Sequence, residues 1–570
     1  MRSGVCGPGR WVSPATEAGE PSLGRRTRPA LATLLLLLAV PPARAASRPA
    51  IPFPHEAVVC VEPLACEAGA TLLAEGGTAP DAAVGAALVL VVVHPQAGNL
   101  LGGSFTLWRS ADGSAEVIDG RESAPAASRT GVAPVAPVAV PHAVAALALL
   151  HARHGRLPWR RVVNPAVRLA RQGISVSPLL ARHLRTHGAR LASDSEAAAL
   201  FFPDGAPLVA GQRLKQPALA DALALLRDDG PAAFRSGGLA RRLVEDAARR
   251  GLPITSGDLA AAEAVVRTPL AVPHHDYRLL APPLPSAGGI FLAQTLRALA
   301  SLRAGPADRG GSALLHAVAQ VTRLAWADRR AWLGDPEFSV APLDRLLDPG
   351  RLRTWIEAMQ SPSMPEGGLG RSSSTPAETP AAEGQTTHIS IVDRFGNAVA
   401  HTTTLNDLFG FGAMARGTGL LWNNELSDFD PPGGSTSAPN ALAPGKRPLS
   451  SMTPLIAERG GRLAFVLGSP GGATIPSTVL QVVLGLIDLG LEPQAAVDAP
   501  RQHVTESAIV LEPGGVPPDV RIGLERSGER VTERIDPEPM QGDVHLIVIG
   551  PEGTLLAATD PRRAGCARGR

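Results

Sequence analysis

Lysine is almost absent from this chain of 570 residues, occurring only at Lys215 and Lys446, and arginine supplies the other basic side chains. Aromatic residues are also few, at 4% of the chain, and acidic and basic residues nearly cancel to a net charge of +2. Because nucleic-acid binding needs a basic surface, often with interleaved aromatic rings, no nucleic-acid partner is expected. The preference for arginine indicates a GC-rich coding sequence rather than a binding surface.

Cysteine is scarce as well, with Cys6, Cys60, Cys66 and Cys566 as its only occurrences. Their spacing relative to histidine does not match a zinc site, and we expect neither a metal nor a cofactor. In an oxidising compartment Cys60 and Cys66 could form a disulfide, but two free thiols fit the sequence equally well.

The N-terminal region lacks an apolar run long enough to span a bilayer, since residues 30–40 form a stretch of only eleven. Arginines at 25, 26 and 28 precede this stretch, and Ala43-Arg44-Ala45 follows it as an A-x-A cleavage site. We therefore expect residues 1–45 to be a signal peptide, with a possible mis-started extension, and the protein to be periplasmic or secreted. An uncleaved membrane anchor is the alternative, although no stable membrane span is expected.

The dipeptide Gln385–Thr386 is the most informative feature that is present, and we interpret it as a site of self-cleavage. A threonine hydroxyl is a weak nucleophile without a base. Cleavage would make Thr386 an N-terminal residue, whose free α-amine supplies that base.

The residues around this site predict a β-hairpin. Residues 387–393 alternate between polar and apolar side chains, which is typical of a half-buried strand. A turn around Phe395 and a threonine-rich returning strand follow. Pairing that is symmetric about Phe395 would place Thr404 opposite Thr386, within reach of its hydroxyl or amine.

Four other segments carry polar groups that could bind a charged ligand. Residues 423–428 gather amide and acidic side chains, and residues 445–452 place two serines beside a Lys-Arg pair. Residues 468–474 form a glycine-rich loop between an apolar strand and an apolar helix, which can present backbone N–H groups to an oxyanion. This loop lacks the Gly-Lys-Ser/Thr ending of a P-loop. Arg121 follows a predicted strand and could grip a carboxylate through two parallel hydrogen bonds.

Taken in order, these motifs resemble the γ-glutamyltransferase (γ-glutamyltranspeptidase) family. Thr-Thr-His at 386–388, Pro-Leu-Ser-Ser-Met at 448–452 and Gly-Ser-Pro-Gly-Gly at 468–472 are highly specific together. Further matches lie at residues 77–84, 121–125, 155–159, 285–289, 327–336 and 560–562, so that the resemblance covers nearly all of 55–565.

The resemblance implies an α+β fold, the four-layer αββα sandwich of N-terminal-nucleophile hydrolases, autoprocessed into two subunits. The precursor would split into a large subunit, 46–385, and a small catalytic subunit, 386–570, which remain together as a heterodimer. The stretch 361–384 is rich in serine, glycine and proline, which is typical of a flexible segment, and it precedes the predicted cleavage site.

The resemblance also implies the site residues and the reaction. Thr386 would be the nucleophile and Thr404 its support, while N–H groups at Gly471 and Gly472 would form the oxyanion hole. The α-carboxylate of the substrate would be held by Arg121, Ser450 and Ser451, and its α-ammonium group by Asn406, Glu425 and Asp428. The substrates would be glutathione and other γ-glutamyl compounds, whose acyl group passes to water or to an amine acceptor.

Two alternatives remain open. A cephalosporin (glutaryl) acylase of the same superfamily would need no ammonium pocket, and a non-catalytic member would act as a binding protein. The sequence also departs from the family: Ser427 stands where an aspartate is usual, and the 428–450 segment is short and has no aromatic residue beyond Phe429. The only tyrosine, Tyr277, lies elsewhere. We expect the resulting open site to favour hydrolysis over transfer.

Overall fold

The computed structural model describes residues 48–570 except for residue 99 and the segments 301–310, 360–383 and 535–540. The predicted signal peptide and nearly all of the serine-, glycine- and proline-rich stretch before Thr386 lie outside the described residues. Among the helices that are described, none has both the length and the apolar character needed to cross a membrane.

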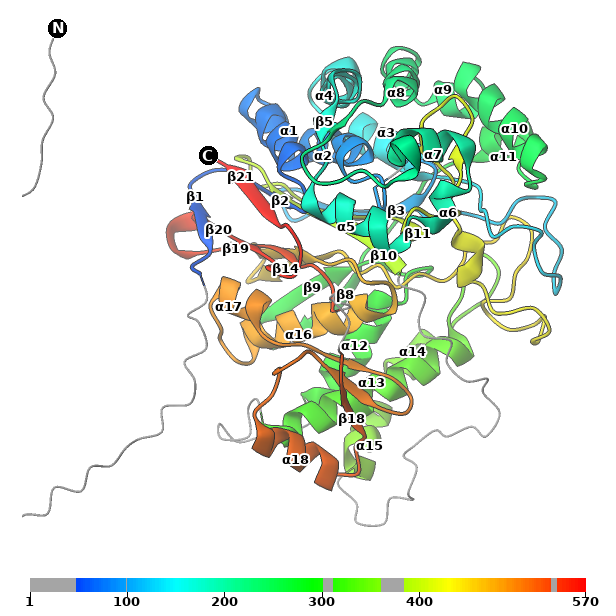
Figure 1. Ribbon diagram of the computed structural model, residues 1–570. Helices are drawn as coiled ribbons and strands as arrows, with labels where there is room; N and C mark the ends of the chain where they lie inside the picture. The colour runs from blue at the N-terminus through cyan, green and yellow to red at the C-terminus, as the bar shows by residue number, and fades with distance from the viewer. Residues whose placement is uncertain (1–47, 99, 301–310, 360–383, 535–540) are drawn as a thin grey trace, which may run out of the picture. The chain divides into compact units, whose positions relative to one another are not determined.

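Two antiparallel sheets of seven strands each form the centre of the fold (Figure 1). The first contains, in spatial order, β21 (Cys566–Gly569), β2 (Ala57–Cys60), β10 (Gly384–Val392), β11 (Ala398–Asp407), β3 (Gly103–Arg109), β4 (Ala115–Gly120) and β7 (Val265–Arg267). The second contains β1 (Ile51–Phe53), β20 (Leu555–Thr559), β19 (His545–Ile549), β15 (Arg462–Gly468), β14 (Leu455–Arg459), β9 (Tyr277–Ala281) and β8 (Leu270–His274).

Helices cover the outer face of each sheet, while the inner faces pack on one another through β10 and β11 against β15 and β19. On the first sheet lie α1 (Pro63–Ala74), α2 (Ala79–Val93) and α3 (Ala143–His154), with α4 (Trp159–Gln172), α8 (Pro217–Asp229) and α10 (Gly238–Arg250) outside them. On the second lie α12 (Gly288–Leu299), α16 (Ile475–Ile487) and α17 (Pro493–Asp498), with α13 (Ser312–Trp332) and α15 (Pro349–Met359) beyond. The mixed α/β fold with stacked sheets agrees with the prediction.

Shorter elements complete the described chain. They are β5 (Ile174–Ser175), α5 (Pro178–His187), α6 (Ala189–Ala192), α7 (Ser195–Phe201), β6 (Arg213–Leu214), α9 (Ala232–Arg235), α11 (Ser256–Ala261), α14 (Leu343–Leu346), β12 (Met414–Ala415), β13 (Leu420–Leu421), β16 (Gln502–Val504), β17 (Ile509–Leu511), α18 (Pro518–Arg526) and β18 (Val531–Glu533).

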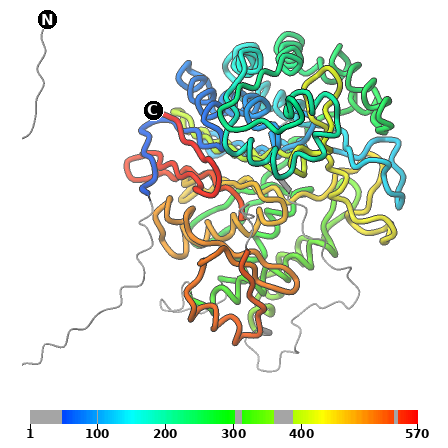
Figure 2. Tube along the Cα trace, in the orientation of Figure 1, coloured from blue at the N-terminus to red at the C-terminus, as the bar shows by residue number. Residues whose placement is uncertain are grey.

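Strands from both ends of the chain interleave in these sheets. In Figure 2 the blue β1 runs beside the red β20, and Phe53 pairs with Leu555. In the first sheet β10, which contains the predicted cleavage site, and β11, which follows it, lie between β2 and β3, which precede it. The parts before and after Thr386 therefore share one core and are not separate domains.

The predicted hairpin is present, but its first strand is buried on both faces rather than one. Ile389 and Ile391 pack into the core that includes α1 and α2. His388 and Ser390 face the second sheet, where Ser390 Oγ donates to the His545 carbonyl at 2.9 Å. The alternation of polar and apolar residues wrongly predicted a solvent face, because these polar side chains satisfy one another inside the protein.

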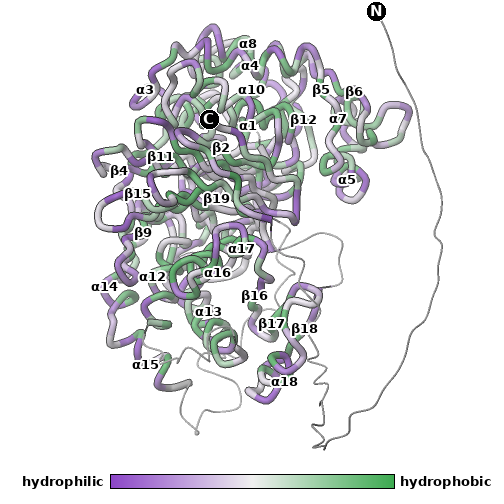
Figure 3. The backbone as a smooth tube through the Cα atoms, turned by 90° about the vertical axis from the view of Figure 1, so that its left-hand side faces the viewer, coloured by the Kyte–Doolittle hydropathy of each residue, from purple (hydrophilic) through white to green (hydrophobic). Residues whose placement is uncertain are grey.

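Hydrophobic residues concentrate along β2, β19 and α16, whereas α18 is more hydrophilic (Figure 3). The structure also joins Cys60 to Cys66 by a disulfide, with their Cα atoms 5.9 Å apart. Cys566 is a free, buried thiol. The sequence left open whether Cys60 and Cys66 form a disulfide, and the structure shows that they do.

The buried Asp81 fixes the start of α2, which packs against β10 and β11. Its Oδ2 accepts the backbone N–H of Thr78 at 2.8 Å, which closes a capping box. The same carboxylate accepts the N–H groups of Arg156 and Leu157 at 2.9 and 3.2 Å. One side chain therefore ties the start of α2 to the connection between α3 and α4.

We expect Asp81→Ala to lower stability by on the order of 3 kcal/mol, because it leaves several backbone donors without a partner in a buried site. Thermal unfolding followed by circular dichroism measures the effect. Asp221→Ala is the matched control, since that carboxylate is 68% exposed. Equal unfolding temperatures for the two variants would contradict the role given to Asp81.

Candidate active site

Thr386 and Thr404 are paired across β10 and β11, as predicted from the symmetry of the hairpin. The Thr386 hydroxyl donates to Thr404 Oγ1 at 3.4 Å, and both residues are only 3% exposed. Thr404 Oγ1 also accepts the backbone N–H of Asn406 at 2.9 Å, which fixes the orientation of this hydroxyl. The pair can therefore exchange a hydrogen bond in a site with little bulk water.

Asn406 lies at the end of β11 with its backbone in the left-handed region, at φ 75°. Asparagine tolerates this conformation better than most residues. Its Nδ2 donates to the Asn424 carbonyl at 3.3 Å, so that the end of β11 contacts the segment that carries Glu425 and Asp428. That segment is the short 3₁₀ helix η3 (Glu425–Asp428).

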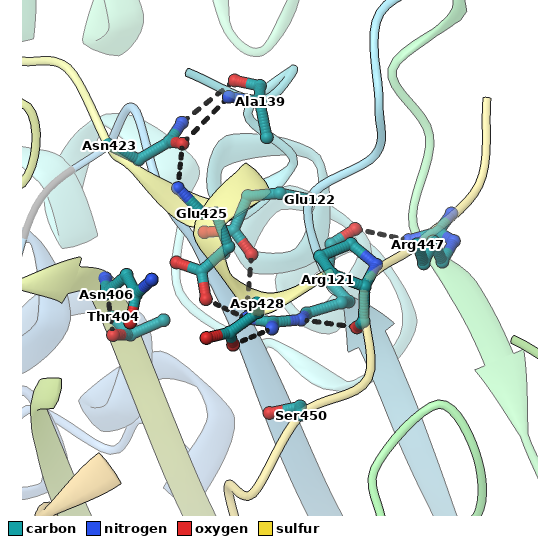
Figure 4. A network of polar contacts seen from close by, with 12 residues as sticks. Arg121, Glu122, Ala139, Thr404, Asn406, Asn423, Glu425, Asp428, Arg447 and Ser450 are labelled. Carbon is teal, nitrogen blue, oxygen red and sulfur yellow. Dashed lines mark hydrogen bonds and ion pairs between the residues drawn. The ribbon is translucent and has the colours of Figure 1, made fainter. Parts of the chain in front are cut away.

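Arg121 forms the centre of a buried ionic network (Figure 4). It directly follows β4, and its Nη2 lies 2.5 Å from Asp428 Oδ2, while its Nη1 is paired with Glu425. Glu122 Oε2 lies 3.4 Å from the same Nη1. The structure thus brings Arg121 together with Glu425 and Asp428, which lie 304 and 307 positions later in the chain.

Three carboxylates contact the Arg121 guanidinium, and Arg329, which interacts electrostatically with Asp428, adds a second positive charge, so the negative charges still outnumber the positive ones. Burial raises the pKa of Glu122 to about 7, and Arg121 only partly offsets this rise. Burial likewise raises the pKa of Glu425 well above its ordinary value. Although burial alone would lower the pKa of Arg121, the attraction of Glu425 and Asp428 holds it above its usual range. The site therefore retains a proton near neutral pH and has room for added positive charge.

Two supporting residues are ones that sequence reasoning did not assign to the site. Asn423 bonds to the backbone of Ala139 through both its amide nitrogen and its oxygen, and this oxygen also accepts the Glu425 N–H at 3.0 Å (Figure 4). Arg447 Nη1 donates to the Arg121 carbonyl at 2.6 Å. The Asn-Asn-Glu run was the only local signal for Asn423.

Ser450 and Ser451 follow a segment that contacts Arg121, whose Nε donates to the Pro448 carbonyl at 3.0 Å. Ser450 is buried, and its Oγ accepts the Met452 N–H at 3.1 Å. The adjacent Lys446 does not act with the serines, because its Nζ donates to the Ala441 carbonyl. Lys446 and Arg447, which the sequence places shortly before the two serines, both hold backbone segments in place in the structure.

Gly471 and Gly472 form the loop between β15 and α16, with φ values of 132° and 55° that favour glycine. A Cβ at Gly471 would lie 2.4 Å from Thr474 Oγ1, so a larger residue would displace the loop. The following 3₁₀ turn, η4 (Gly472–Thr474), packs against β10. This brings the N-terminal end of α16 to the strand that carries Thr386.

A cavity of about 390 Å³ is lined in part by neighbours of Asp428 in the chain. Leu426 and Phe429, on either side of Asp428 in the chain, contribute to its lining, together with residues 131–134 and 430–436. Apolar and polar groups both face this space.

Comparison with known proteins agrees with this geometry. Residues 65–569 match the family model described as Gamma-glutamyltranspeptidase. The Glutathione hydrolase proenzyme of Escherichia coli (strain K12) is 36% identical over 530 residues, covering 89% of this chain and 90% of the relative. The Acylase ACY 1 proenzyme of Pseudomonas sp. (strain V22) is 35% identical over 532 residues, with 89% and 92% covered.

Among solved structures, the cephalosporin acylase from Bacillus halodurans superposes with a TM-score of 0.82 at 25% identity, covering 92% of this chain and 97% of that chain. The gamma-glutamyltranspeptidase of Helicobacter pylori superposes with a TM-score of 0.52 at 29% identity, over 53% of this chain and 91% of that chain. The family match includes strands of both sheets and every site residue described above. This chain therefore belongs to the gamma-glutamyltranspeptidase family.

Proposed function

We propose that the protein is an exported glutathione hydrolase/γ-glutamyltransferase, which cleaves γ-glutamyl amides through a γ-glutamyl-Thr386 acyl-enzyme. The observation that carries this proposal is the meeting of Arg121, Glu425 and Asp428 close to the Asn406 end of β11. A γ-glutamyl group ends in a carboxylate and an ammonium group side by side. A site with a guanidinium at its centre and an excess of carboxylates around it is complementary to such a zwitterion.

Donor recognition follows from the charges in the network. The α-carboxylate would bind Arg121 with the help of Ser450 and Ser451, and the α-ammonium would bind Asn406, Glu425 and Asp428. Glu425 Oε2 is buried and has no hydrogen-bond partner among the described residues. An ammonium group would satisfy this oxygen and offset the negative charge, which an uncharged ligand could not do.

Maturation would break the peptide bond between Gln385 and Thr386 and produce the large (46–385) and small (386–570) subunits as a heterodimer. The names of the bacterial relatives, which call them proenzymes, fit such a precursor. Both subunits contribute strands to one sheet, so they would remain associated after cleavage.

Catalysis would then proceed in two acyl-transfer steps. Thr386 Oγ attacks the γ-amide carbonyl while the α-amine of Thr386 accepts the hydroxyl proton, and the N–H groups at Gly471 and Gly472 stabilise the oxyanion. The amine released from the donor takes up that proton as its bond to the acyl carbon breaks. The γ-glutamyl group then remains as an ester on Thr386. Water, or the amino group of an amino acid or dipeptide, next attacks the ester and releases the hydroxyl. No cofactor is required for these steps.

An acylase is the second candidate, and the relative named Acylase ACY 1 and the cephalosporin acylase structure both favour it. A glutaryl group has the carboxylate of the donor but lacks its ammonium group. Glu425 and Asp428 would then have no cation from the substrate to bind, and for this reason we prefer the γ-glutamyl donor. A non-catalytic binding protein is a third possibility and would remain uncut.

Export is supported by the disulfide between Cys60 and Cys66, since such bonds persist in oxidising compartments. The proposed signal peptide itself lies outside the described residues. We therefore propose a periplasmic or secreted location.

The choice between γ-glutamyl transfer and acylase activity can be tested with a γ-glutamyl anilide and the matching glutaryl anilide, which lacks only the amine. We expect kcat/KM for the γ-glutamyl compound to be higher by about 100-fold or more, because the glutaryl compound leaves buried carboxylates unpaired. A preference for the glutaryl compound would establish the acylase alternative.

Thr386→Ala should leave a single full-length polypeptide without activity. The proposed self-cleavage and the proposed attack on the donor both depend on the hydroxyl that this change removes. Thr387→Val is the matched control, since Thr387 is also buried and its hydroxyl has no partner among the described residues. N-terminal sequencing of the small subunit from the unmodified protein should begin Thr-Thr-His. Efficient cleavage of the Thr386→Ala precursor would show that the scissile bond lies elsewhere.

Glu122 should make donor binding depend on pH. Burial raises its pKa to about 7, so that it is neutral below this value and becomes an added negative charge beside Arg121 above it. We expect KM for the γ-glutamyl donor to fall several-fold as the pH increases through this range, because the ionised carboxylate attracts the donor's ammonium group, and Glu122→Gln to flatten the profile. Glu263→Gln, whose side chain is 68% exposed, should retain the wild-type dependence. A KM profile unchanged by Glu122→Gln would refute this role.

A further inference from the structure

A second group of titratable side chains lies at the tip of the β8–β9 hairpin. His274 Nε2 lies 2.7 Å from one carboxylate oxygen of Asp488, and His275 Nε2 lies 3.0 Å from the other. Each of the three residues offers one potential ligand atom, and these three atoms all lie within 4.8 Å of one another. His274 is buried, Asp488 is half-buried and His275 is exposed, so the group opens to solvent on one side.

The backbone at this tip brings two consecutive side chains to the same partner. In a regular strand, neighbouring side chains point to opposite faces. Here His274 pairs with Tyr277, which leaves His275 and Asp276 as the turn, and His275 adopts a positive φ of 52°. This less common conformation for a residue other than glycine allows both imidazoles to reach Asp488.

The spacing of the three groups suits a metal ion. Zinc binds imidazole nitrogen and carboxylate oxygen at about 2.0–2.2 Å in tetrahedral geometry, which separates neighbouring ligand atoms by roughly 3.4 Å. The nitrogen–oxygen distances of 2.7 and 3.0 Å need only a small expansion to reach this separation. Two neutral histidines and one carboxylate also leave a fourth position open.

The surroundings contain charges of both signs. Asp488 caps the C-terminal end of α16, where the helix dipole favours a cation. Arg297 and Arg353 line an adjoining cavity of about 450 Å³, and Arg297 Nη1 donates to the Leu347 carbonyl at 2.7 Å. The exposed Asp276 is paired with Arg459. The two arginines border the space next to the three ligands and would favour water or an anion at the fourth position.

We propose that His274, His275 and Asp488 form a binding site for a divalent transition-metal ion of the zinc class. The ion would connect the β8–β9 hairpin to the C-terminal end of α16. The loop that contains Gly471 and Gly472 lies at the other end of this helix of 13 residues, about 20 Å away. The site is therefore structural, takes no part in the reaction and does not depend on the proposed function.

Untagged protein stripped of metal and titrated with Zn²⁺ in a non-chelating buffer at neutral pH tests the proposal. We expect one zinc ion per chain by equilibrium dialysis with elemental analysis, with micromolar or tighter affinity. Removing one ligand by His275→Gln should weaken binding by about 10-fold or more. Because His275 is exposed, this variant should fold normally, which circular dichroism can verify.

Asp488→Asn should cause a similar loss, and His55→Gln, which changes an exposed histidine remote in sequence from the three ligands, should cause none. An anomalous-scattering peak among the three side chains in crystals grown with zinc would confirm the location. Absence of stoichiometric binding would show that the three residues form only an ion pair. Binding that survives both His275→Gln and Asp488→Asn would place the ion elsewhere and overturn the proposal.

Discussion

The pairing of β10 with β11 is the constraint on which the rest of the site depends. It sets Thr386 opposite Thr404 and brings Asn406 toward the segment that contains Glu425. Both strands lie in the middle of their sheet, between the outer helices and the second sheet, so their register is held on two faces. A slip by one residue would turn every side chain to the opposite face, which would bury the wrong set and move Thr386 away from its partner.

The ionic network around Arg121 shows why a charged ligand suits this site. Removing a guanidinium and several carboxylates from water is costly, and their mutual attraction offsets the cost only when the charges balance. Here the carboxylates outnumber the cations, and the raised pKa of Glu122 and Glu425 reflects that imbalance. A bound ammonium group would correct the imbalance, whereas a carboxylate alone would increase it. The site would therefore distinguish γ-glutamyl from glutaryl ligands mainly by charge rather than by shape.

Local sequence patterns predicted local structure well. The strand before Arg121 and the register of the hairpin around Phe395 both follow from periodicity and turn residues. Patterns could not reveal that the polar face of β10 is buried, because Ser390 bonds to His545 on β19, a strand that is distant in sequence. The convergence of Arg121 with Glu425 and Asp428 came from the family resemblance, since no local signal links residues so far apart. The disulfide and the roles of Asn423 and Arg447 likewise required three-dimensional contacts.

The structure also shows where the chain runs before any cut is made. β10 begins at Gly384, two residues before Thr386, and Gly384 pairs with Asp407 next to Asn406, with an irregularity between Gly384 and Thr386. In the intact chain this backbone therefore occupies the edge beside the proposed ammonium pocket. Cleavage before Thr386 would then have a second effect besides exposing the α-amine. It would free the new chain end at residue 385 to move away from the proposed ammonium pocket. The uncut polypeptide would thus act as its own competitive blocker, and the enzyme would become accessible to small molecules only at the moment it becomes able to react with them.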